Sequence, residues 1–174
     1  MEVVEVPQGV TAELKGNEVV IKGSLGTNIR KFNDLLLIVS KEGNTIKVDA
    51  TEEKAIRQKA LNSTKSMATE IRNDIKGVQK HFEVKMEVVF AHFPATVEVK
   101  GARIAINKIL GERVPRYANI VGTTKVEVKD KAVRIYGTSL DDVTQTAANV
   151  RTACKIRKKD IRIFQDGVYY SLEE

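Results

Sequence analysis

The sequence predicts an α+β protein made of two tandem copies of one fold, each a small antiparallel β-sheet assembly packed on one α-helix. The chain aligns with itself at an offset of 85 residues, where residues 11–16 (TAELKG) match residues 96–101 (TVEVKG). After a slip of two residues, residues 46–51 match residues 133–138. Each copy runs from short alternating segments into one segment of helical periodicity. We therefore expect two domains, residues 1–80 and 81–174.

The first copy is expected to form a set of antiparallel strands and then a helix. Its alternating segments are separated by the glycine turns at residues 15–17 and 42–44. Thr51 has the properties of an N-cap, and Glu52 and Glu53 suit the positive end of the helix dipole. The helix is expected to run to Gly77. The expected strands are at residues 11–14, 18–22, 36–40 and 45–49.

The second copy repeats this order. Thr138 or Ser139 is expected to cap its helix, which runs to Cys154 with an apolar stripe facing inward. Residues 82–90, between the copies, alternate as a strand, so the connection is expected to be ordered. The expected strands of the copy itself are at residues 95–100, 103–107, 124–128 and 132–136.

Composition excludes several classes of protein. The longest apolar run, residues 35–39, is far shorter than the ~20 residues of a membrane span. The first residues carry acid where a secretory signal carries base, so we expect a cytoplasmic protein. One cysteine and two histidines are too few for a structural zinc site, and a disulfide within the chain is impossible.

Candidate catalytic groups are few. His81 and His92 are the only side chains suited to general base catalysis near neutral pH, and Cys154 falls on the apolar stripe of its helix. Phosphate-binding and dinucleotide motifs are absent from the sequence. Residues 23–26 (GSLG) have the spacing of the backbone-clamping loop of KH domains, but a tight turn explains them better. We expect no enzyme, no cofactor and no small-molecule substrate.

Positive charge is concentrated in the second half of the chain. Residues 1–88 hold 14 basic and 13 acidic side chains, whereas residues 89–174 hold 15 and 10. Seven of ten arginines and all four tyrosines lie in the second half. Arginine pairs with phosphates and tyrosine stacks on rings, so these counts indicate a surface for an anionic aromatic partner.

The strongest candidate site is the basic segment at residues 151–162, followed by aromatic residues. The helix dipole stabilises cations near the C-terminal end of a helix, which could explain some of them, but six are more than this effect needs. With three arginines from turns of the same copy they form a face suited to RNA phosphates and bases. Burial of one tyrosine in the sheet is the alternative to stacking. The candidate RNA-binding residues are Arg103, Arg113, Arg116, Arg151, Lys155, Arg157, Lys158, Lys159, Arg162, Tyr169 and Tyr170.

Three motifs resemble a known family. Residues 89–94 (VFAHFP) resemble an Ala-His-Phe-Pro signature, residues 107–112 (NKILGE) are similar to an Asn-x-Leu-Gly-Glu turn, and residues 159–169 (KDIRIFQDGVY) resemble a C-terminal signature. All three belong, in this order, to the archaeal and eukaryotic branch of the universal large-subunit ribosomal protein family numbered six. The resemblance covers essentially the whole chain.

The resemblance implies a structural protein of the large ribosomal subunit, without catalytic residues. It implies that the second copy binds large-subunit rRNA near the stalk base, where translational GTPases dock, and that neighbouring ribosomal proteins are partners. It also implies a turn at Asp166 and Gly167 that presents the terminal aromatics. The competing hypothesis is a protein-interaction module whose basic copy docks acidic partners.

Overall fold

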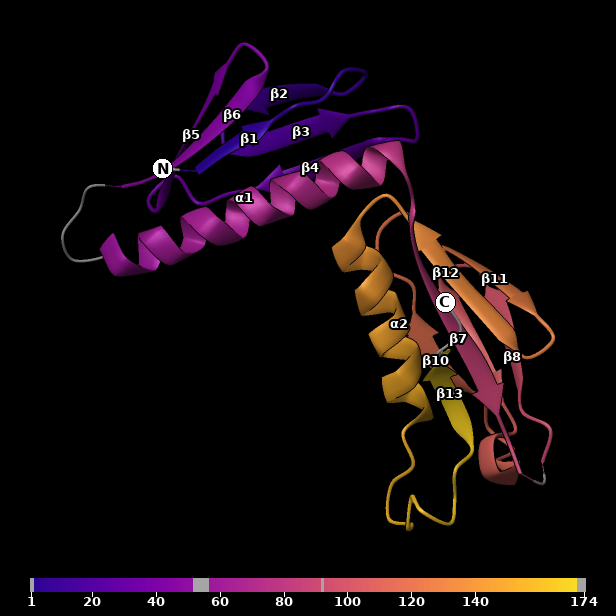
Figure 1. The fold of residues 1–174 in the computed structure, drawn as a ribbon. Helices are drawn as coiled ribbons and strands as arrows, with labels where there is room; N and C mark the ends of the chain where they lie inside the picture. The colour runs from indigo at the N-terminus through magenta and orange to yellow at the C-terminus, as the bar shows by residue number, and fades with distance from the viewer. Residues whose placement is uncertain (1, 52–56, 92, 172–174) are drawn as a thin grey trace. The chain divides into compact units, whose positions relative to one another are not determined.

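The computed structural model describes residues 2–51, 57–91 and 93–171. The chain divides into two compact units, Met1–His81 and Phe82–Glu174, whose helices and strands are drawn in Figure 1. Each unit has its own hydrophobic core. None of the described helices is long and apolar enough to cross a membrane.

The first unit contains two three-stranded antiparallel sheets and one long helix. The sheets have the orders β1-β6-β5 and β2-β3-β4. Helix α1 (Arg57–Gln79) packs on both of them through Ala60, Met67, Ile71 and Ile75, which lie on one face of the helix. The strands are β1 (Glu2–Glu5), β2 (Thr11–Lys15), β3 (Glu18–Lys22), β4 (Thr27–Lys31), β5 (Leu37–Glu42) and β6 (Thr45–Ala50).

The second unit has the same plan with one strand added. Its sheets have the orders β10-β9-β8 and β11-β12-β7-β13, and helix α2 (Leu140–Cys154) packs on strands of both sheets (Figure 1). Ser139 caps α2, because its Oγ accepts a hydrogen bond from the Asp142 amide at 3.3 Å. The remaining elements are β7 (Phe82–Val89), β8 (Thr96–Lys100), β9 (Arg103–Asn107), the short 3-10 helix η1 (Ile109–Gly111), β10 (Arg116–Asn119), β11 (Lys125–Lys129), β12 (Ala132–Gly137) and β13 (Gly167–Tyr170).

The predicted fold class is confirmed. Strand β4 corresponds to β10, and the pairing of β1 with β6 corresponds to the pairing of β7 with β12. The second unit alone has a further strand: β13 pairs with the outer side of β7, while nothing in the described chain pairs with the outer side of β1.

Four short strands do not follow from the sequence pattern. These are β1, β4, β10 and β13. In β4 the buried residue is Asn28, while Ile29 is 60% exposed, so the polarity of this strand is the reverse of the usual alternation. The predicted start of the first helix, with Glu52 and Glu53, lies outside the described residues.

Residues 23–26 form the hairpin connection between β3 and β4. The Gly23 amide donates to the Gly26 carbonyl at 2.9 Å, and the Leu25 amide donates to the Val78 carbonyl at 3.1 Å. A Cβ at position 23 would stand 2.6 Å from Cγ2 of Val78, so glycine lets the turn press against the end of α1. The segment is a tight turn between strands that has a packing role.

Candidate nucleic-acid interface

The basic segment lies at the end of α2 and on the ordered loop that leads to β13 (Figure 1). Asp160 organises this loop, since its carbonyl accepts from the amides of Ile163 and Phe164 at 3.2 and 3.0 Å. The side chains of Lys155, Arg157 and Lys158 are exposed. The loop therefore presents several cations at the surface.

Arg116 anchors the loop to the helix. Its Nε and Nη2 donate to the two carboxylate oxygens of Glu112 at 2.8 and 2.5 Å, and Nη1 donates to the carbonyls of Ala153 and Lys155 at 3.0 and 3.1 Å. The hydrogen bond between the side chains lowers the pKa of Glu112 and raises that of Arg116. Arg116 thus belongs to the interface as the residue that holds the end of α2.

Two further cations of the loop also have partners. Arg162 is 86% exposed, and its Nη2 lies 2.9 Å from Oδ2 of Asp160. This hydrogen bond lowers the pKa of Asp160. The ammonium of Lys159 lies 4.7 Å from the centre of the Phe164 ring. Both cations remain at the surface, where an incoming phosphate could compete for them.

Arg151 brings the two terminal tyrosines together. Its guanidinium carbon lies 5.2 Å from the centre of the Tyr169 ring and 5.9 Å from that of Tyr170. The tyrosines are 36% and 45% exposed, so neither belongs to the core. The site therefore presents a guanidinium and two aromatic rings to solvent.

A groove of about 550 Å³ runs between α2, the start of the loop and β13. Its apolar lining includes Cys154, Ile156 and Val168, which are buried. Burial raises the pKa of the Cys154 thiol to about 11, so this thiol is neutral and unreactive near pH 7. The groove is lined by Ala148, Arg151, Thr152, Cys154, Lys155, Ile156, Ile161, Gly167, Val168, Tyr169 and Tyr170.

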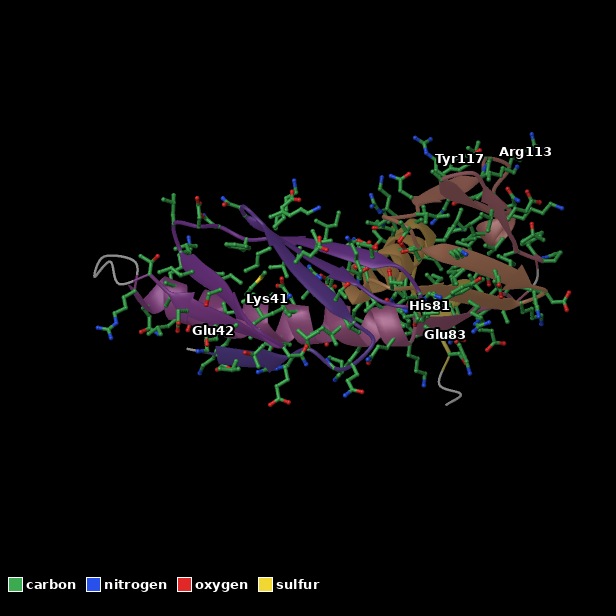
Figure 2. All side chains as sticks on the ribbon, turned by 90° about the horizontal axis from the view of Figure 1, so that it is seen from above. Lys41, Glu42, His81, Glu83, Arg113 and Tyr117 are labelled. Carbon is green, nitrogen blue, oxygen red and sulfur yellow. The ribbon has the colours of Figure 1, made fainter. Side chains whose placement is uncertain are left out.

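The remaining candidate arginines lie outside this groove. Arg103 begins β9 and pairs with Asn119, three positions along β10 from Arg116, which is about 10 Å along a strand. Arg113 is exposed on the loop before β10 and projects from the surface of the second unit, as does Tyr117 (Figure 2). Six of the nine predicted cations thus lie on the end of α2 and the loop, Arg116 contacts the end of α2 from β10, and Arg103 and Arg113 lie apart.

Sequence reasoning missed the apolar part of this surface. Ile161 and Ile163 are 69% and 73% exposed on the same loop as the cations. These side chains add exposed apolar area beside the cations, which a bound partner would cover. They are isolated in the sequence among charged residues, and a periodicity search does not detect them.

Asp166 and Gly167 do not form the turn expected from the resemblance. Gly167 is the first residue of β13, and the buried Asp166 carboxylate accepts a hydrogen bond from the Ala91 amide at 3.0 Å. This bond ties the start of β13 to the segment after β7. The two residues still precede the aromatics, but Gly167 lies in the strand and Asp166 directly before it.

The candidate catalytic and metal-binding residues form no centre within the described residues. No group of three or more His, Cys, Asp or Glu side chains there could hold a metal ion. His81 is exposed at the end of the first unit, and His92 lies outside the described residues.

The second unit thus has a basic, partly aromatic surface on a duplicated fold. A family model described as Ribosomal protein L6 matches the chain twice, over residues 6–81 and 93–167. The chain belongs to the ribosomal protein L6 family. Each match covers most of one unit, and the resemblance seen in the three sequence motifs is confirmed.

Curated relatives agree with this family. The large ribosomal subunit protein uL6 of Methanocella arvoryzae is 41% identical over 167 residues, covering 95% of this chain and 93% of the relative. The protein of the same name from Methanosarcina mazei is 42% identical with the same coverage, and that from Methanosphaera stadtmanae is 42% identical over 97% of this chain and 90% of the relative. These relatives are structural ribosomal proteins, so the family is not one of enzymes.

Proposed function

We propose that this protein is a structural constituent of the large ribosomal subunit in the cytoplasm and that it binds large-subunit rRNA mainly through its second unit. Family membership supports the ribosomal role. The proposed place in the subunit, at the stalk base near the docking region of translational GTPases, follows from the motif resemblance, as do neighbouring ribosomal proteins as partners.

The observation that carries the RNA-binding proposal is the loop between α2 and β13. It presents exposed cations on an ordered backbone, next to a guanidinium that contacts two exposed rings. Cations neutralise backbone phosphates, and aromatic faces accept unstacked bases. The proposed RNA ligands are Arg151, Lys155, Arg157, Lys158, Lys159 and Arg162 with Tyr169 and Tyr170, and Arg103 and Arg113 are proposed as outlying phosphate contacts.

The salt dependence of rRNA binding tests this proposal. Six phosphate contacts give a slope of log affinity against log salt of roughly −4 to −5, at about 0.7 to 0.9 per contact. Changing Lys158 and Lys159 together to glutamine should flatten the slope by about one to two units. The matched control changes Lys125 and Lys129, two exposed lysines of β11 in the same unit, to glutamine. It should leave the slope unchanged.

Equal effects of the two double variants would contradict a localised RNA interface. The rival function, docking of an acidic protein, is tested by competition with polyglutamate at the same total charge. Displacement of rRNA by polyglutamate at equal charge would favour the rival. Persistence of the rRNA complex would support RNA as the partner, because a flexible acidic chain offers no bases to the tyrosines.

A further inference from the structure

The groove beside β13 has features that backbone neutralisation does not require. Its floor is apolar, with Cys154, Ile156 and Val168 all buried, and the Cys154 thiol is neutral. Its volume of about 550 Å³ lies within the range of small-molecule sites, roughly 300 to 1,000 Å³. Neutralisation of phosphates needs no such recess, so the groove fits an uncharged, partly apolar group of the partner.

The rim of the groove is built for a flat group. Tyr169 and Tyr170 are neighbours on β13, and neighbouring strand residues normally point to opposite faces. Here both rings lie within 6 Å of the one guanidinium of Arg151, at 5.2 and 5.9 Å. Three planar groups thus meet at the groove, and each leaves part of its surface to solvent.

Gly167 helps to place the Tyr169 ring. A Cβ at position 167 would stand 3.1 Å from Cε2 of this ring, so the ring lies directly over the glycine. A larger residue at the first position of β13 would require the ring to shift by a few tenths of an ångström. Glycine at this position therefore lets the ring lie close to the strand.

Charge next to the groove indicates what the flat group is attached to. Lys155 lines the groove, and Arg157 and Lys158 follow on the exposed loop. A planar group beside phosphates is a nucleobase in a nucleic-acid chain, and an unstacked base is the part of RNA that aromatic and guanidinium planes accept. An acidic peptide would satisfy the cations but would leave the apolar floor and the rings unused.

We propose that this groove takes up one unstacked nucleobase of the bound RNA. The base stacks on the surface formed by Arg151, Tyr169 and Tyr170, and Lys155 with the cations after it holds the phosphates on either side. This inference rests on the proposed RNA-binding function and adds to it a recognised RNA feature, namely a bulged or looped-out nucleotide.

Three RNA hairpins with the same stem test the proposal on the full chain. One is fully paired, one carries a single bulged adenosine, and one carries an abasic ribose at the bulge. The abasic hairpin keeps the backbone distortion and the phosphate but lacks the base. The intact protein should bind the bulged hairpin about 5- to 150-fold more tightly than the abasic one, which is the range expected for one stacked base.

Variants assign the preference to the groove. Arg151→Lys keeps the charge but removes the planar guanidinium, and the double change Tyr169→Leu and Tyr170→Leu removes both aromatic rings. Each should abolish the preference for the base and keep most of the affinity for the paired hairpin. The control Tyr117→Leu, at a 52% exposed tyrosine on β10, should keep the preference. Because Arg151→Lys changes an exposed side chain, it provides the answer if the double variant is unstable.

Equal affinity of the intact protein for the bulged and abasic hairpins would overturn the base-binding proposal and leave the proposed function standing, provided that the salt slope is kept. A preference that survives both the lysine and the leucine variants would also overturn it. Loss of all binding to the three hairpins would contradict the proposed RNA-binding function itself.

Discussion

The side chains that fix the first unit include a buried carboxylate. Asp74 of α1 is 2% exposed and accepts hydrogen bonds from Nε and Nη2 of Arg30, both at 3.0 Å, and from Nδ2 of Asn28 at 3.2 Å. The two partners lie on β4, so the network joins the helix to the edge strand of a sheet. A buried carboxylate is tolerated only when it is paired and hydrogen-bonded in this way.

We predict that Asp74→Ala lowers the free energy of unfolding of the first unit by about 3 to 5 kcal/mol, because it breaks a buried ion pair from one side. The control is Glu70→Ala. Glu70 is 42% exposed and lies 3.6 Å from Nη1 of Arg30, so its removal should cost less than about 1 kcal/mol. The free energy of unfolding of each variant is measured in urea, with hydrogen exchange of the α1 amides as the signal for the first unit. Equal losses of stability in the two variants would contradict the prediction.

Cys154 makes the stability of the second unit depend on pH in the alkaline range. Burial raises the pKa of its thiol from 9.0 to about 11. Between these values the unfolded chain loses the thiol proton while the folded chain keeps it, so unfolding becomes easier as pH rises. The stabilisation is fully present below pH 9 and disappears as pH approaches 11, a change of about 2 to 3 kcal/mol.

The matched variant is Cys154→Ala, which has no thiol to titrate. Other groups also titrate in this range, so the quantity to measure is the difference between the two proteins. The loss of stability of the parent protein between pH 9 and 11 should exceed that of the variant by about 2 to 3 kcal/mol. Parallel stability curves would show that the thiol is already solvated in the folded state.

At the scale of elements, Arg116 joins β10, the end of α2 and the basic loop. We predict that Arg116→Lys, which keeps the charge, removes the two-point contact with Glu112 and at least one bond to the helix carbonyls. Loss of such bonds costs about 1 to 3 kcal/mol. Hydrogen exchange of residues 155–166 should speed up, and rRNA affinity should fall.

Arg113→Lys provides the comparison for this prediction. Arg113 is an exposed arginine three residues earlier, on the loop before β10, so the two variants have the same charge and the same kind of substitution. It should leave exchange of residues 155–166 unchanged. If both variants lose affinity without any change in exchange, Arg116 contacts RNA directly rather than through the loop.

Sequence patterns predicted most strands, including the edge strands β2, β5, β8 and β11, but not β1, β4, β10 and β13. Strand β6 buries every second residue, Ile46 and Val48, and β3 and β9 each bury three apolar residues in a row, so their patterns are visible in the sequence. Strand β4 buries an amide that depends on Asp74, 46 residues later, and no local pattern contains this partner. The same limit applies to the site. Counting charges found the cations, but Arg116 donates to the Ala153 carbonyl 37 residues later, and no local pattern predicts such a contact.

At the scale of the whole molecule, we predict that the second unit binds rRNA much more strongly than the first. Residues 1–81 and 82–174, produced as separate chains, should differ sharply in rRNA affinity, because seven of ten arginines and all four tyrosines are in the second. Each unit has its own core, so each should fold alone. Filter binding at a fixed salt concentration measures the difference, and equal affinities would contradict the assignment of the interface.

The additional strand of the second unit also affects the behaviour of the protein before it meets its partner. An unpaired strand edge can add a strand from another chain and so start aggregation. In the second unit β13 covers the outer side of the long strand β7, so the edge passes to β13, which has only four residues. In the described first unit β1 has no such cover, but it is only four residues long, carries Glu2 and Glu5, and has its Val3 carbonyl bonded by Nη2 of Arg72 at 3.3 Å. At this edge the two copies of one fold thus limit self-association by different means, the second with a short added strand and the first with a short strand that carries charge.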